Sequence, residues 1–300
     1  MMENINYYDL CRDFDKLGIK KGDNLNLKIS LKSIGHVEGG ASTVVNALLD
    51  VIGREGTIVA ESFVNSFYFP RLMGEKALVT QKTTSYAGAI ANEMLKRADS
   101  YRSTHPIQKF VAIGKYAKYL TERHTPDSMP YNVLKELAEL NGKNLRVGGL
   151  NKVVGVGTTH VAITSLRLRQ RRIKSGVKYI DEKGKEKVFM LNWAGGCAKG
   201  FNNLMNIYKE NGCIVSEGIV GEAQSLITDM KRTLEYEIEL FSKNHKAFFC
   251  NDPCCVDCRI SWDFSEKKLL KFISNCIKEK KYKNIIKLIG LYLYSAKFPK

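Results

Sequence analysis

Between residues 6 and 150 the chain alternates short apolar segments with longer amphipathic ones, and few folds accommodate this alternation. The segments LNLKISL, GTIVAESFV and FVAIG have the β-branched, apolar character of buried strands. The intervening segments TVVNALLDVIG, SYAGAIANEMLKRAD and GKYAKYLTERH repeat apolar residues at helical spacing, and VLKELAELNGKNLRVGGL adds a further helix, turn and strand. Because strands that alternate with helices form layered proteins, we expect an α/β fold: an α/β/α sandwich with a mixed central sheet.

The pattern changes after residue 175. The segment VKYIDEKGKEKVFML predicts a hairpin with DEKGKE as its turn, and strands outnumber helices until GEAQSLITDMKRTLEYEIELF. We find no internal repeat, low-complexity tract or linker in the sequence. We therefore expect one mixed α/β domain over residues 1–264, followed by a tail over residues 265–300.

The tail is strongly basic. Lysine and arginine outnumber aspartate and glutamate by 47 to 31 in the whole chain, and residues 265–300 hold ten lysines against two glutamates. The tail predicts two amphipathic helices with lysine on one side, which either dock on the domain or lie on an anionic membrane; we favour docking. The apolar runs are too short to span a bilayer and the start lacks a signal sequence, so we expect a cytoplasmic protein.

The cysteines suggest two alternatives. The segment FCNDPCCVDCRISWDF places Cys250, Cys254, Cys255 and Cys258 within nine residues. These thiols are potential zinc ligands, and Asp252 or Asp257 offers an oxygen ligand. Structural zinc sites usually combine two separated ligand pairs, so we favour buried free thiols over zinc in this single local cluster. The isolated cysteines are interpreted as small core residues: Cys11, Cys197, Cys213 and Cys276.

Among the five histidines, His160 has the most informative surroundings. It lies in GVGTTHVA, where a glycine-rich turn precedes Thr158 and Thr159, and either threonine is suited to cap a helix. The positive end of a helix disfavours an imidazolium, so a histidine in the first turn stays neutral and can accept a proton. A purely structural histidine beside a helix cap is an equal alternative.

Several motifs together resemble one family. In chain order they are LGIKKGD, SLKSIGHVEGGASTVVNALLDVIGREGTIV, SYAGAIANEML, YRSTHPIQKFVAIGKYA, GTTHVA and GIVGEAQSLITDM. Their order and spacing over residues 5–240 resemble the antibiotic N-acetyltransferases, which include the aminoglycoside 3-N-acetyltransferases. The resemblance implies that residues 1–264 form an acyl-CoA-dependent N-acyltransferase domain that uses acetyl-CoA or another short acyl-CoA.

The resemblance also implies a cofactor site. Backbone amides around Ser30, Leu31, Lys32 and Ile34 would face the pantetheine and pyrophosphate, and Ser103 and His105 would approach from the other side. A pyrophosphate favours N–H groups and a cation such as Lys32 or Arg102. The family usually has a histidine at the position of Lys28 and a serine at that of Lys109, so this chain adds two cations near the predicted cofactor site.

By the same resemblance, His160 is the general base that deprotonates the attacking amine, and the acyl group passes to it directly. Thr159, with Thr158 or loop amides as alternatives, would donate a hydrogen bond to the oxyanion. The family often has a carboxylate three residues after this histidine, where this chain has Ile163. Two alternatives follow: another acid, Glu222 or Glu61, orients the ring, or His160 is a less effective base than in the family.

The acceptor is predicted from charge. The segment SLRLRQRRIK follows His160 and suits phosphates better than a polycation. We therefore expect a nucleotide-linked amino sugar held by Arg167 and Arg171; the alternatives are an aminoglycoside and, for the whole chain, a catalytically silent relative. We expect no nucleic-acid partner, because basic residues are spread thinly along the chain outside residues 167–174 and the tail. The sequence leaves the oligomeric state open.

Overall fold

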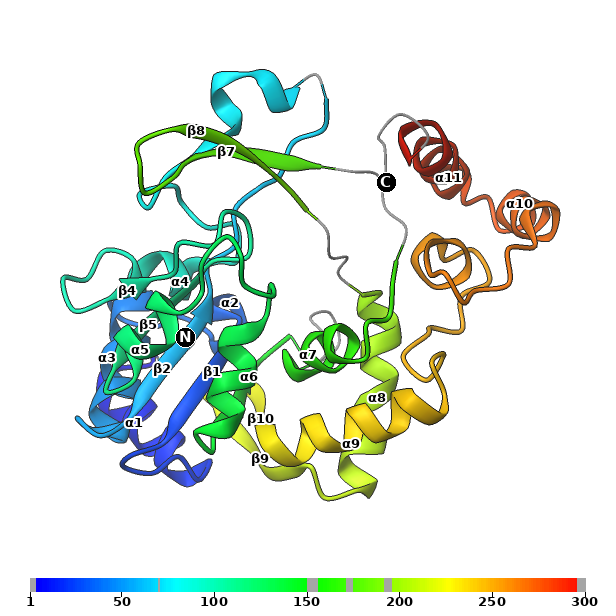
Figure 1. Cartoon of the computed structure of the whole chain (residues 1–300). Helices are drawn as coiled ribbons and strands as arrows, with labels where there is room; N and C mark the ends of the chain where they lie inside the picture. Colours follow the sequence, from blue (N-terminus) through cyan, green and yellow to red (C-terminus); the bar gives the residue numbers. More distant parts are fainter. Residues whose placement is uncertain (1–3, 70, 150–155, 171–174, 192–195, 296–300) are drawn as a thin grey trace.

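The computed structural model describes residues 4–69, 71–149, 156–170, 175–191 and 196–295, and is built around a seven-stranded sheet (Figure 1). The strands of this sheet are β1 (Asn24–Ile29), β2 (Thr57–Glu61), β4 (Tyr101–Arg102), β5 (Phe110–Gly114), β6 (Lys143–Val147), β9 (Ile214–Val220) and β10 (Ala223–Asp229). Their order is β4-β5-β2-β1-β6-β10-β9. β1 pairs in parallel with β2 and β6, whereas the pairs toward both edges are antiparallel. The expected mixed central sheet is confirmed.

Helices cover both faces of the sheet (Figure 1). One face carries α1 (Tyr7–Lys16), α3 (Ala41–Ile52) and α4 (Ala89–Met94); the other carries α5 (Ala117–Glu122), α6 (Asn132–Glu139), α7 (Thr158–Ser165) and α9 (Met230–Lys243). The strands alternate accordingly: Ile58 packs with the first group, and its neighbour Val59 packs with the second. This two-faced burial confirms the α/β/α sandwich predicted from the sequence.

A ladder of buried polar side chains crosses the middle of the sheet. Asn26 Nδ2 donates to Asn144 Oδ1 at 2.8 Å, and Asn144 Nδ2 donates to Thr228 Oγ1 at 3.0 Å. These residues are direct neighbours in register on β1, β6 and β10. Because a buried amide without a partner is costly, the ladder favours this register over a shifted one, and so fixes where the three strands end.

A second, small sheet contains the predicted hairpin. It comprises β3 (Leu78–Val79), β7 (Gly176–Ile180) and β8 (Glu186–Met190), next to the 3₁₀ segments η1 (Arg71–Met73) and η2 (Glu75–Ala77). One helix in this half, α8 (Ala198–Glu210), is absent from the sequence prediction. Its glycine and three asparagines lower helix propensity, but Phe201, Leu204 and Tyr208 bury one helical face.

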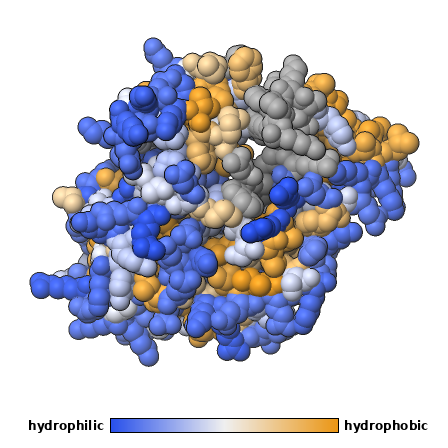
Figure 2. Space-filling model, in the orientation of Figure 1, coloured by the Kyte–Doolittle hydropathy of each residue, from blue (hydrophilic) through white to orange (hydrophobic). Residues whose placement is uncertain are grey.

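The tail docks on the rest of the chain. After the π-helical segment η3 (Asp257–Ser261), α10 (Leu269–Lys278) and α11 (Tyr282–Ser295) bury Phe272, Cys276 and Leu288 against Cys254 and Ile260. Other apolar residues of these helices are exposed, and Figure 2 shows orange side chains in the region where Figure 1 places α10 and α11. Within the described residues, every helix is too short or too polar to cross a membrane.

Candidate active site

A cavity of about 630 Å³ lies at the carboxyl ends of the parallel strands β1, β2 and β6. Open α/β sheets bind ligands at this edge, because the strands end there and the chain turns outward. The polar part of its lining comprises Lys28, Ser30, Lys32, Glu61, Tyr86 and Arg146. Arg146 is buried on β6, and burial lowers its pKa to about 10.

The loop after β1 is held tightly against the loop after β6. The Ser30 N–H donates to the Val147 carbonyl at 2.9 Å, and the Ser33 hydroxyl donates to the Ser30 hydroxyl at 2.7 Å. Gly148 has a φ of +69°, and a Cβ on it would lie 2.3 Å from the Cβ of Ser33. A residue without a side chain is therefore required where the two loops meet.

The predicted cofactor residues of the first loop divide into two groups. Ser30, Leu31 and Lys32 line the cavity, the last two in the short helix α2 (Leu31–Ile34). Ile34, in contrast, is fully buried in the core beneath the loop, and its carbonyl accepts from the Glu222 N–H at 2.8 Å. Ile34 therefore supports the loop from below rather than lining the cavity.

Ser103 and His105 lie inside the protein, with no exposed surface. The Ser103 hydroxyl accepts from the Phe110 N–H at 2.9 Å, and His105 Nδ1 accepts from the Gln108 N–H at 3.0 Å. The His105 ring stacks on His124 with centroids 4.8 Å apart, and burial lowers the pKa of His105 to about 2. The two side chains hold residues 103–110 in shape, and neither lines the strand-end cavity.

Lys28 and Lys109, the two cations that the family usually lacks, lie in different parts of the structure. Lys28 lies in the cavity wall with its Nζ 3.4 Å from Glu61 Oε1. Lys109 instead lines a different cavity, of about 590 Å³, together with Thr104, Tyr179 and Asp181. Its side chain is almost completely buried; burial and, to a smaller extent, the charge of Arg102 lower its pKa to about 7. Lys28 and Lys109 therefore line two different cavities.

We expect Lys109→Met to stabilise the protein near neutral pH. A charged Lys109 destabilises the folded state fully below its folded pKa of about 7, and this cost disappears as the pH rises to the unfolded value of 10.5. The variant should gain about 5 kcal/mol in free energy of unfolding at pH 6.5 and nothing near pH 10.5. Denaturant titrations across this pH range test the prediction. Lys115→Met, at an exposed position, is the control. Destabilisation by Lys109→Met at pH 6.5 would contradict the prediction.

His160 is held between two aromatic rings. It lies in the first turn of α7, where its ring stacks on Tyr131 with centroids 4.4 Å apart and meets the edge of Phe201 at 5.2 Å. The helix begins directly over the sheet, because a Cβ on Gly157 would lie 3.1 Å from Asn26 Nδ2. The half-buried imidazole is therefore fixed in orientation at the start of the helix that the sequence predicted.

Thr159, the neighbour of His160, points into the protein. It is fully buried and donates to Glu237 Oε1 at 2.5 Å, and Tyr208 donates to the same oxygen. A hydroxyl already committed to a buried carboxyl is a poor donor to a reaction intermediate. In place of the expected oxyanion role we therefore propose a positioning role for Thr159, which anchors the first turn of α7 to α9.

The buried acid near α7 is Glu237, which the sequence analysis missed. Of the two predicted acids, Glu61 is paired with Lys28, and Glu222 lies over Gly35, where an added Cβ would be 3.0 Å from Glu222 Cδ. Glu237 lies on the buried face of α9, between Thr233 and Phe241. A carboxylate at an apolar position of a predicted amphipathic helix is a signal that sequence analysis can use.

We expect Glu237→Gln to remove a pH-dependent loss of stability. Burial raises the pKa of Glu237 to about 7, so the protonated form stabilises the fold below the unfolded value of 4.5, and this stability is lost as the pH rises through 7. The difference in free energy of unfolding between the variant and the parent should shift in favour of the variant by about 3 kcal/mol between pH 4.5 and pH 8. Chemical unfolding at both pH values measures it, with exposed Glu239→Gln as control; a constant difference would refute the assignment.

Of the two predicted phosphate-binding arginines, the structure describes Arg167. Arg167 follows the carboxyl end of α7 with a φ of +52°, and its side chain is exposed. Arg171 lies outside the described residues. His160 and Arg167 are seven residues apart across α7, which corresponds to about 10 Å along a helix axis.

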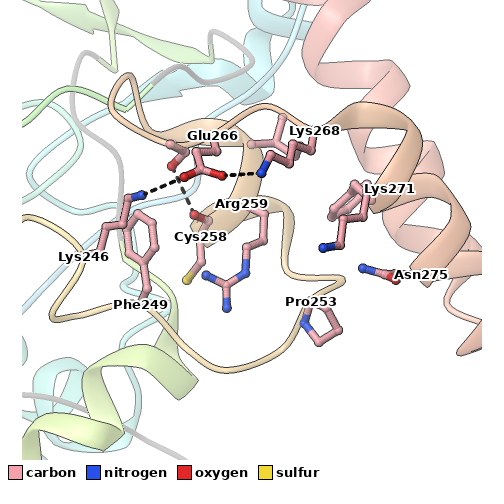
Figure 3. Close-up of a pocket in the computed structure, with 12 residues that line it drawn as sticks. Lys246, Phe249, Pro253, Cys258, Arg259, Glu266, Lys268, Lys271 and Asn275 are labelled. Atoms are coloured by element: carbon pink, nitrogen blue, oxygen red, sulfur yellow. Dashed lines mark hydrogen bonds and ion pairs between the residues drawn. The ribbon is translucent and has the colours of Figure 1, made fainter.

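A further cavity, of about 280 Å³, lies between residues 246–266 and α10 (Figure 3). Lys246, Arg259, Lys268 and Lys271 line it, and Glu266 pairs with Lys268 at 3.0 Å. The cavity is basic, and its lining is remote in sequence from the strand ends. Of the site residues proposed from the sequence, its lining includes Cys258 alone.

Comparisons with known proteins agree with this architecture. A family model described as aminoglycoside 3-N-acetyltransferase matches residues 27–242. An aminoglycoside N(3)-acetyltransferase III of Serratia marcescens is 35% identical over 128 residues, 38% of this chain and 48% of that protein, so the chain spans about half the length of the curated relatives it matches.

Solved structures share the fold. Sisomicin-bound AAC-VIa superimposes with a TM-score of 0.70 at 23% identity, covering 80% of this chain and 98% of that one. AAC-IIIb with CoASH gives a TM-score of 0.65 at 20% identity, covering 80% and 97%. The match to the family model extends from β1 into α9 and so includes both the strand-end cavity and the helix of His160. The chain belongs to the aminoglycoside 3-N-acetyltransferase family.

Proposed function

We propose that the protein is an acetyl-CoA-dependent N-acetyltransferase that acylates an amine of an aminoglycoside. The observation that carries this proposal is the 630 Å³ cavity at the strand ends, whose wall is the segment Ser30–Lys32, in a family member with a histidine fixed at the start of α7. We place the reaction in the cytoplasm, where acetyl-CoA is available.

The cavity offers suitable groups for coenzyme A. The N–H groups of Leu31 and Lys32 lie in the first turn of α2, where backbone donors have no partner within the helix. The exposed Lys32 and the buried Arg146, which both line the cavity, add positive charge for the pyrophosphate. The solved relative with CoASH supports acetyl-CoA as the donor, because it shares the fold that forms this strand edge.

His160 is the proposed general base. A neutral acceptor amine attacks the thioester carbonyl, the imidazole takes the proton from the nitrogen, and the tetrahedral intermediate collapses with loss of the coenzyme A thiolate. The amide product and free coenzyme A result, and the imidazolium then returns its proton to the thiolate or to solvent. Tyr131 and Phe201 hold the ring, while Thr159 and Glu237 anchor the helix turn that carries it.

The acceptor is the part of the sequence prediction that we revise. A nucleotide-linked amino sugar was expected because of the arginines after His160, but Arg167 is exposed beyond the far end of α7. The family model and the curated relatives carry aminoglycoside names, and one solved relative holds sisomicin. An aminoglycoside is therefore the acceptor these observations support better.

The test is coenzyme A release from acetyl-CoA, measured by a thiol reagent with a panel of acceptors. We expect release to depend on aminoglycosides such as sisomicin and gentamicin, with N-acetylated product in the mass spectrum. Release with nucleotide-linked amino sugars alone would move the proposal to that substrate class. The absence of release with every amine would favour a catalytically silent relative.

A further inference from the structure

Four cysteine sulfurs converge beside the start of α8. The Sγ atoms of Cys197, Cys250, Cys255 and Cys258 all lie within 4.8 Å of one another, and those of Cys197 and Cys255 are 3.6 Å apart. Zinc bound to four thiolates at about 2.3 Å places the sulfurs about 3.8 Å apart, which this cluster nearly matches. All eight cysteines of the chain are free thiols, so no disulfide explains the convergence.

We propose that Cys197, Cys250, Cys255 and Cys258 bind one zinc ion as a structural tetrathiolate site. The ligands come from two segments, one at the start of α8 and one at residues 250–258. This combination of separated segments is the usual construction of a structural zinc site, and it removes the objection that the cysteines form one local cluster.

The ligand set differs from the one considered from the sequence. Cys254 points away from the four sulfurs and packs with Cys276 and Phe272 under the tail helices. Cys197, interpreted from the sequence as an isolated core residue, takes its place in the cluster. The two aspartates are also committed elsewhere, since Asp252 pairs with Lys281 at 3.2 Å and Asp257 with Lys287 at 2.7 Å.

A close backbone contact brings the two segments together. A Cβ on Gly200, in the first turn of α8, would lie 2.1 Å from the Phe248 carbonyl oxygen and 3.0 Å from the Cys250 nitrogen. The absence of a side chain thus lets α8 approach the chain just before Cys250. This contact places Cys197, the residue that precedes the helix, over the other three sulfurs.

The surroundings favour thiolates. Cys197 precedes the first residue of a 13-residue helix, whose N-terminal partial charge stabilises an anion, and the Cys250 N–H donates to the Cys258 sulfur at 3.4 Å. The cavity lined by Cys197 and Cys255 carries five lysines against two aspartates. Four thiolates on one Zn²⁺ carry a net charge of −2, which this surplus of lysines complements.

The site would hold two parts of the structure together. Figure 3 shows Cys258 on the segment beneath α10, with its sulfur directed away from the Glu266 ion pairs. This segment supports the tail, while α8 carries Phe201, which contacts the His160 ring. Zinc would therefore join the support of the tail to the wall of the candidate active site, without taking part in acyl transfer.

Elemental analysis of the full-length chain, purified under reducing conditions without chelator, tests the proposal. We expect about one zinc ion per chain, and after replacement by cobalt a thiolate-to-cobalt charge-transfer band with tetrahedral ligand-field bands. Cys197→Ser and Cys258→Ser should weaken zinc binding at least about tenfold in competition with a chelator. Cys254→Ser, in the same sequence cluster, is the matched control and should retain zinc.

Two results would overturn the site. The first is that the parent protein is purified without zinc and shows no thiolate–cobalt band. This result would be decisive even if the serine variants failed to fold. The other is loss of zinc in Cys254→Ser with retention in Cys197→Ser. Both readouts are independent of acetyl transfer, so they leave the proposed function unaffected.

Discussion

His160→Ala is expected to lower kcat by about 10²- to 10⁴-fold, with the KM for acetyl-CoA nearly unchanged. In the proposed mechanism the imidazole accepts the proton of the attacking amine, so its loss should raise the barrier of the chemical step. Cofactor binding should survive, because the ring belongs to α7 and does not line the cavity wall formed by Ser30–Lys32. Steady-state thiol release with an aminoglycoside acceptor measures both constants.

His245→Ala is the control for this loss. His245 is exposed and contacts the edge of Phe264, away from the strand ends, so its removal should leave kcat within about twofold of the parent. A thermal melt of each variant separates lost chemistry from lost folding. Full activity in His160→Ala would show that another group takes the proton.

Gly148→Ala is expected to reduce kcat/KM for acetyl-CoA by about 10²-fold. The new Cβ would lie 2.3 Å from the Cβ of Ser33, and the backbone φ of +69° adds strain of about 1–3 kcal/mol. The loop after β1 must then move, and Ser30 and Lys32 in the cavity wall move with it. Isothermal titration with coenzyme A and the kinetic constants together report the displacement.

Gly184→Ala is the control for Gly148→Ala, because it introduces the same backbone strain without a steric clash. Gly184 has a φ of +73° in the turn between β7 and β8, but a Cβ there would meet nothing within 4 Å. It should lose stability as Gly148→Ala does, yet bind coenzyme A normally. If both variants lost the same coenzyme A affinity, the loss in Gly148→Ala would result from reduced stability and not from displacement of the loop after β1.

Local patterns predicted the layers of the fold because one face of each strand and helix is buried. The alternation of Ile58 and Val59 between the two cores and the apolar stripe of α3 are properties of neighbouring residues. α8 was missed because Asn202, Asn203 and Gly200 are poor helix formers, and tertiary packing of its apolar face overrides their propensity.

The candidate site was predicted less completely, because it depends on contacts between distant residues. The start of α7 and the position of His160 followed from a local motif. The burial of Thr159 against Glu237, 78 residues away, did not, nor did the enclosure of Ser103 and His105. Arg146 had a usable signal, since an arginine in an otherwise buried strand implies a ligand or a committed partner.

The cysteines show the same limit. Their local spacing identified Cys250, Cys255 and Cys258, but the fourth sulfur of the cluster comes from a residue 53 positions earlier. Spacing alone could not favour Cys197 over Cys254, because the choice depends on the approach of α8 that Gly200 permits.

A structure of the protein with bound coenzyme A is the most direct test of the account. We predict that the pantetheine follows the wall formed by Ser30–Lys32 and Gly148, with the sulfur near His160. An attacking nitrogen should then fit about 3–3.5 Å from both the acyl carbon and the ring. Coenzyme A bound in the basic cavity of Lys246 and Arg259, or in the cavity of Lys109, with its sulfur remote from His160, would contradict the account.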